Sequence, residues 1–228
     1  MSRSRNAAHS NPDWFARIIA ILGLLVALAA VLVPYFQAEK DKQEHLTVVA
    51  KPEGAGGVIR LSVDESQSKA VQIPWILTLS NTGRTKLSIV SYRIAQLRYG
   101  GLMFFPGLDG SMTDRENKTV SFPLALDAGD SIAVRLHIGF EPTGEISKLL
   151  RDLFLSGGPL DPHKTFLVLA EKGLTIYGGK ATMTKYDGGG HTVVFEPSAV
   201  SEAPLYNITL LTGRNQEFST TCSPYPSP

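Results

Sequence analysis

The hydrophobic positions of this chain follow two patterns, one near the N-terminus and one beyond it. From Ile18 to Gln37 no residue is charged, and Ile, Leu, Val and Ala fill most positions. A helix rises about 1.5 Å per residue, so roughly 20 such residues cross the ~30 Å hydrocarbon core of a bilayer. Because backbone amides in lipid must be hydrogen-bonded within the segment, the run predicts a single transmembrane helix at residues 18–37.

Two other interpretations of this run are less favoured. A cleaved signal peptide would also have a basic start, and "ALAA" at residues 27–30 resembles a cleavage site. The apolar run continues through Val33, however, which is more typical of an uncleaved signal-anchor. A buried core helix would be amphipathic, whereas this segment is apolar on all sides.

The orientation of the helix is predicted from its basic flanks. Arg17 directly precedes the apolar run, and this favours residues 1–17 as a cytoplasmic tail. The C-terminal part would then lie outside the plasma or inner membrane. The nearby basic residues are equal in number on the two sides, which leaves the reverse orientation open: Arg3, Arg5 and Arg17 before the run, Lys40, Lys42 and Lys51 after it.

Beyond a charged stalk at residues 38–46, the pattern changes to a period of two. The clearest example is "VQIPWILTLSN" at 71–81, in which alternate residues are apolar, as in a strand with one buried face. "NTG" at 81–83 predicts a tight turn into the strand at 85–97, so that the two form a hairpin. Further strands are expected at 46–51, 58–63, 131–140, 165–171, 173–178, 191–196 and 206–213.

One helix is expected between these strands, near residues 145–155. Its apolar residues fall on a single stripe, Thr143 can cap its start, and glycines at 157 and 158 end it. The last residues, 219–228, read as a disordered tail. The whole pattern predicts an antiparallel β-sandwich at 47–218 with one helical insert.

Two strings in this region carry a resemblance. "WILTLSNTGRTKLSIVSYRI" followed by "LDAGDSIAVRLHI" resembles the strand pattern of bacterial immunoglobulin-like modules. The whole chain also resembles uncharacterised bacterial membrane proteins with an N-terminal anchor. The resemblance implies an immunoglobulin-like fold and carries no catalytic residues. The disulfide of antibody domains has no counterpart beside Trp75, because Cys222 is the single cysteine.

The amino-acid composition argues against several kinds of binding site. The 228 residues include 22 basic and 21 acidic side chains, for a net charge of +1. This balance argues against a nucleic-acid-binding surface, which needs clustered Lys and Arg. A single cysteine also excludes an intramolecular disulfide and a Cys-based zinc site.

No motif of a hydrolase, a zinc protease, a P-loop or a dinucleotide site occurs, so we expect no catalytic residue, cofactor or metal site. The loop with Asp109, Asp114 and Glu116 offers oxygen ligands for Ca²⁺, but a solvated acidic loop is the simpler interpretation. The five histidines are expected on the surface: His9, His45, His137, His163 and His191.

One apolar stretch is a candidate interaction patch. Leu102, Met103, Phe104 and Phe105 are consecutive, and if exposed they would bind a partner or touch a membrane. The alternative is a strand that is buried on both faces. The 145–155 helix has a similar pair of interpretations, since it could lie on a bilayer or cap the open end of the sandwich.

These features predict a protein held in the lipid bilayer by residues 18–37, with a non-catalytic sandwich that binds an envelope protein or itself. A membrane-anchored enzyme acting on envelope polymers, with Asp109, Asp114 or His191 in a cleft, is the first alternative. A cytoplasmic scaffold in the reverse orientation is the second. The single Cys222 suits the scaffold because the cytosol keeps thiols reduced.

Overall fold

The computed structural model describes residues 13–41, 43–54, 56–61, 70–98, 100–201 and 203–225. It divides into two units, 1–43 and 44–228, which are considered separately. Most of the predicted cytoplasmic tail, part of the strand predicted at 58–63, and the end of the predicted disordered tail lie outside the described residues.

The N-terminal unit is a helix, α1 (Asp13–Asp41). Its stretch from Trp14 to Phe36 is long and apolar enough to cross a membrane, and none of it is buried inside the structure. The helix is longer than the predicted span and continues into the segment predicted as a stalk. Pro34 lies near its C-terminal end.

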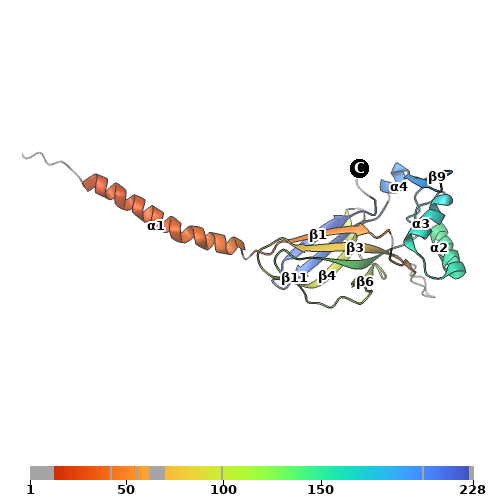
Figure 1. Cartoon of the computed structure of the whole chain (residues 1–228), viewed down its shortest axis with the longest axis horizontal. Helices are drawn as coiled ribbons and strands as arrows, with labels where there is room; N and C mark the ends of the chain where they lie inside the picture. The colour runs from red at the N-terminus through yellow and green to blue at the C-terminus, as the bar shows by residue number, and fades with distance from the viewer. Residues whose placement is uncertain are drawn as a thin grey trace, which may run out of the picture. The chain divides into compact units, whose positions relative to one another are not determined.

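The C-terminal unit is mainly β and contains two five-stranded antiparallel sheets (Figure 1). The first sheet has the order β1-β3-β8-β6, with β2 paired to β3. Its strands are β1 (Leu46–Pro52), β2 (Arg60–Leu61), β3 (Val71–Asn81), β6 (Asp109–Thr113) and β8 (Ser131–Phe140). The second sheet has the order β12-β11-β4-β5, with β7 paired to β4. Its strands are β4 (Leu87–Arg98), β5 (Gly101–Met103), β7 (Leu124–Leu126), β11 (Leu205–Thr212) and β12 (Glu217–Cys222).

The two sheets face each other across a shared apolar core. Leu77 and Leu79 of β3 are fully buried there, as are Ile208 and Leu210 of β11. The ring of Trp75 on β3 meets the ring of Tyr206 on β11 edge to face, with centroids 5.6 Å apart. The alternation seen in the sequence therefore arises because one face of each strand is removed from water.

The helices gather at one end of this sandwich, in a region that we call the cap (Figure 1). The cap comprises α2 (Gly144–Gly157), α3 (Pro162–Glu171), β9 (Ala181–Lys185), β10 (His191–Phe195) and α4 (Pro197–Ser201). A second apolar cluster joins it to the sandwich, where Ile73 and Phe140 pack with Ile146, Leu150 and Leu169. The predicted start of the helix is confirmed, since the Thr143 side chain accepts a hydrogen bond from the Ile146 amide at 3.5 Å.

The predicted hairpin between 71–81 and 85–97 is wrong. β3 and β4 belong to different sheets, so the chain crosses from one layer to the other at Asn81. The buried Asn81 amide supports this crossing by donating to the Thr85, Leu126 and Asp127 carbonyls at 2.9–3.1 Å. Both strands have one apolar face, and facing each other across the core buries these faces against one another.

The prediction of a single helix in the insert is also wrong. Residues 165–171 were expected as a strand but form most of α3. The helix starts at Pro162, and the Asp161 side chain caps it by accepting from the Lys164 amide at 2.8 Å. Residues 173–178 form a turn rather than a strand, closed by a hydrogen bond from the Gly178 amide to the Thr175 carbonyl at 3.0 Å.

The predicted disorder at 219–228 is wrong for the residues that are described. Ser219 to Cys222 belong to β12, which pairs with β11. Cys222 and Tyr225 are buried. The chain therefore remains packed on the domain through Tyr225.

The chain enters the domain at the end of the sandwich opposite the cap. Buried Glu44 accepts a hydrogen bond from the Thr212 hydroxyl, and the His45 carbonyl accepts from the Thr82 amide at 3.0 Å. Thr82 directly follows the last residue of β3, whereas the cap packs on the first residues of that strand. An 11-residue strand spans about 36 Å, so the point of entry and the cap are well separated.

Candidate functional site

The predicted interaction patch lies on and beside β5, the last strand of the second sheet. Leu102 and Phe104 are each 56% exposed. Met103 is half-buried, and Phe105 packs against the core of the sandwich. The four residues are therefore divided between the surface and the interior, and Leu102 and Phe104 remain as the exposed pair.

Strand pairing extends the exposed pair across the second sheet. Leu102 of β5 lies opposite Leu97 of β4, and Leu97 lies opposite Leu205 of β11. Residues paired in this way share one face of a sheet. Ile94, which is three residues before Leu97, points into the core, so the leucines lie on the opposite, outer face.

We call Leu102, Leu97 and Leu205 the leucine row. Leu102 and Leu205 are exposed, and Leu97 is half-buried. Leu97 and Leu205 also line a hollow of 660 Å³ between the second sheet and the start of the cap. Arg98 and Glu141 contribute charged groups to its wall. The leucine row is apolar, and the hollow beside it has a wall of mixed polar and apolar groups. An apolar centre with a polar margin is the usual anatomy of a protein-binding site.

The acidic loop is held together by its own hydrogen bonds. The Asp114 carboxylate accepts from the Glu116 and Lys118 amides at 2.8 and 2.9 Å, and Glu116 pairs with the Lys118 ammonium at 2.7 Å. Asp109 accepts from the Tyr92 hydroxyl at 2.9 Å. Burial and this bond raise the pKa of Tyr92 well above its usual value. In the described part of the chain, no three His, Cys, Asp or Glu side chains come together as a metal site.

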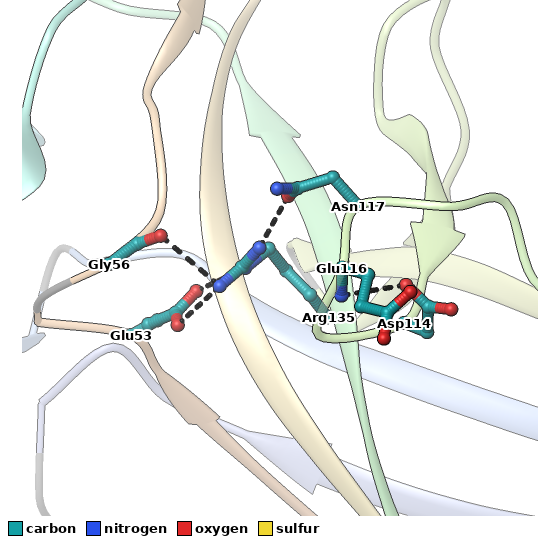
Figure 2. Close-up of polar contacts among 6 residues, drawn as sticks. All are labelled: Glu53, Gly56, Asp114, Glu116, Asn117 and Arg135. Carbon is teal, nitrogen blue, oxygen red and sulfur yellow. Dashed lines mark hydrogen bonds and ion pairs between the residues drawn. The ribbon is translucent and has the colours of Figure 1, made fainter.

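The same loop contributes to a buried network around Arg135 of β8 (Figure 2). The guanidinium donates to both Glu53 oxygens, at 2.6 and 2.9 Å, and to the Gly56 carbonyl at 3.2 Å. Its remaining nitrogen donates to the Asn117 side chain at 2.5 Å. All three nitrogens of the guanidinium have partners within the domain, so the arrangement joins two loops to the sheet and leaves little of this charge for a ligand.

The surface position predicted for His137 is wrong, because this side chain is 2% exposed. It points away from the core, but the segment from Gly107 to Gly110 covers that face of β8. Gln72 and Arg60 hold the segment by donating to the Gly107 and Gly110 carbonyls at 2.9 and 2.8 Å. Burial and the charge of Arg60 lower the pKa of His137 to about 4.

The residues named for the enzyme hypothesis lie on different elements. Asp109 and Asp114 belong to β6 and the loop after it, whereas His191 begins β10 in the cap. His191 lies near His163 of α3, with ring centroids 6.2 Å apart, and both are exposed as predicted. The two histidines line an apolar pocket in the cap, and no carboxylate is among its lining residues in the described chain.

Of the surface features, the sequence identified Leu102 and Phe104 but not Leu97 or Leu205. The latter two lie in ordinary strands, and only the pairing of β5, β4 and β11 aligns them with Leu102. No model of a known protein family matches this chain, and no curated protein matches it in sequence.

Proposed function

We propose that this protein is a single-pass membrane protein whose immunoglobulin-like sandwich lies outside the plasma or inner membrane. There it binds an envelope protein, or a second copy of itself, without catalysis. α1 supports the membrane part of this proposal, because it has the length and composition of a membrane-spanning helix. The two facing antiparallel sheets support the immunoglobulin-like part.

The leucine row is the observation that carries the binding part. Leu102 and Leu205 are apolar, exposed and aligned on one face of a sheet, beside a hollow that can accept a partner side chain. Exposed apolar residues are ordinary when scattered, but contiguous ones with a polar margin mark interaction sites. β5 is also the last strand of its sheet among the described residues, so its outer edge can pair with a strand of the partner.

Site-specific photo-crosslinking of the full chain in native membranes tests the binding. A photoreactive phenylalanine analogue at Leu102 should yield a defined crosslinked product. The same analogue at Val49 is a matched control, since Val49 is a comparably exposed apolar residue on the first sheet. Leu205→Asp should abolish the product at 102. Equal products at 102 and 49, or a product that persists in Leu205→Asp, would remove this surface from consideration.

Fusions after Pro228 test the orientation separately. Alkaline phosphatase should be active in the membrane fraction, and a fluorescent protein that matures only in the cytosol should remain dark. The opposite result would place the sandwich in the cytoplasm and make a scaffold at the inner face of the membrane the function to pursue. Because this readout does not involve the leucine row, the two parts of the proposal can fail independently.

A further inference from the structure

The cap contains a pocket of 460 Å³ that plays no part in the proposed protein-binding surface. Its walls come from several parts of the chain, including Pro52 of β1 and the turn at 174–177. α3 contributes Phe166 and Leu167, β10 contributes Val193 and Phe195, and the C-terminal segment contributes Tyr225. The volume falls in the range of roughly 300–1,000 Å³ that is typical of small-molecule sites.

Aromatic packing keeps this pocket formed in the structure. The ring of Tyr225 lies 4.9 Å from that of Phe195 and 6.0 Å from that of Tyr177, measured between centroids. Tyr177 in turn packs on Phe140 of the sandwich, at 4.7 Å. Since Tyr225 is buried, a residue near the end of the chain forms a fixed wall of the pocket.

The polar groups of the pocket are few. Its two histidines, His163 and His191, come from different elements and have ring centroids 6.2 Å apart. The hydroxyl of Tyr225 already has a partner in Thr175. In the described chain no Asp, Glu, Lys or Arg lines this space. An imidazole always has at least one N–H to donate, so the pair suits a hydrogen-bond acceptor, above all an anion.

We propose that this pocket binds a single acyl chain that ends in a carboxylate. The hydrocarbon would lie against Phe166 and Val193, and the carboxylate would accept hydrogen bonds from His163 and His191. A peptide suits the pocket less well, because its backbone amides would enter an apolar space without partners.

Photoaffinity labelling of the full chain in lipid nanodiscs tests this inference. The probe is dodecanoate with a diazirine on its chain, and labelled peptides are located by mass spectrometry. Labelling of the peptides that contain α3 and β10 should be saturable. Excess dodecanoate should reduce it about tenfold, and dodecanol, which lacks the charge, less than about twofold. Any labelling of α1 from lipid-dissolved probe should not saturate, which gives an internal reference.

Two neighbouring residues of β10 provide a matched pair of variants. Val193 lines the pocket, whereas Val194 is 59% exposed and absent from its lining. Val193→Trp should reduce cap labelling about tenfold, and Val194→Trp should leave it unchanged. Circular dichroism verifies that each variant is folded, and Leu167→Trp replaces Val193→Trp if the latter is not.

The imidazoles are tested by the double variant His163→Gln and His191→Gln, with His45→Gln as the control. The double variant should lose the preference for dodecanoate over dodecanol, and His45→Gln should retain it. Equal competition by the two compounds in the unaltered protein would overturn the carboxylate assignment. Cap labelling that does not saturate, or that is the same in the two tryptophan variants, would overturn the pocket as a binding site.

Discussion

Arg135 and Glu53 form a bidentate ion pair that is almost entirely removed from water. Nε and Nη2 of the arginine lie 2.6 and 2.9 Å from the two carboxylate oxygens, and the side chains are 9% and 11% exposed. The hydrogen bonds to Glu53 raise the pKa of the guanidinium above its usual value. The arginine therefore stays charged, and the Glu53 carboxylate is the counter-charge that balances it in the interior.

Removing the carboxylate should be costly. Glu53→Gln leaves the buried guanidinium without its counter-charge, and we expect a loss of about 3 kcal/mol in the free energy of unfolding. Denaturant unfolding measures this. Glu116→Gln is the matched control, because that carboxylate belongs to an exposed pair with Lys118 and should contribute less than about 0.5 kcal/mol.

Replacing both partners distinguishes charge from packing. Arg135→Met combined with Glu53→Leu should be more stable than Glu53→Gln alone, since no unpaired charge remains in the interior. If Glu53→Gln cost no more than Glu116→Gln, the pair would not hold these loops on the sheet.

His137 should make the domain sensitive to acid. Its pKa is lowered from 6.5 to about 4 in the folded protein, first by burial and then by Arg60. Between these values the unfolded chain binds a proton that the folded chain does not, so stability falls as the pH falls through this window. Above the unfolded pKa the group contributes no pH dependence.

Thermal unfolding of His137→Gln between about pH 7 and pH 4.5 checks this expectation. The variant cannot titrate but keeps a donor for the Val58 backbone, with which His137 is hydrogen-bonded. Its unfolding temperature should fall less on acidification than that of the unaltered protein. Exposed His45→Gln should keep the original slope, and an unchanged slope in His137→Gln would assign the acid sensitivity to other groups.

Gly139 should tolerate no side chain. A Cβ at this position would collide with the Gly107 carbonyl oxygen and approach Leu108, and both are backbone contacts. The Gly139 amide also donates to the Leu108 carbonyl at 2.8 Å, so the two segments cannot separate without losing that bond. Gly139→Ala should cost about 3 kcal/mol or more of stability. Gly144→Ala, which meets nothing within 4 Å, should be neutral or stabilising by about 0.5 kcal/mol.

Cys222 should be inert while the domain is folded. Burial raises the pKa of its thiol to about 12, so the reactive thiolate is scarce near neutral pH. A thiol reagent at about pH 8 should react only after denaturant is added. The control is Thr221→Cys in a Cys222→Ser background, which places a thiol at the exposed neighbouring position and should react at once.

Elements with a single dominant contact surface were predictable from sequence. β3 and β8 have the bounds that their alternation indicates, because each places one face in the core. The segment 165–171 was mistaken for a strand, since its Phe, Leu and Val favour either structure. The deciding signal was local: Asp161 followed by Pro162, a helix cap and a first helical residue.

What could not be predicted depends on contacts between distant parts of the chain. The strand that contains His137 was predicted with the correct bounds. A loop covers the outer face of this strand, and the alternation of residues within the strand does not indicate that loop. Leu205 joins Leu102 only through pairing with β4. The local sequence pattern therefore identified Leu102, whereas Leu97 and Leu205 were recognised only from the pairing of the strands.

The position of β11 and β12 determines when this protein can fold. β11 pairs with β4, and Tyr225 closes the cap, so the second sheet and the cap both need residues that are synthesised after the other elements of the domain. α1 needs only its own hydrogen bonds and is synthesised before the domain. A growing chain thus acquires its apolar helix long before its domain can form. A chain that stops before β11 leaves an edge of β4 unpaired and the core open. Synthesis through Tyr225 is therefore the step after which the domain can close and its core is protected from aggregation.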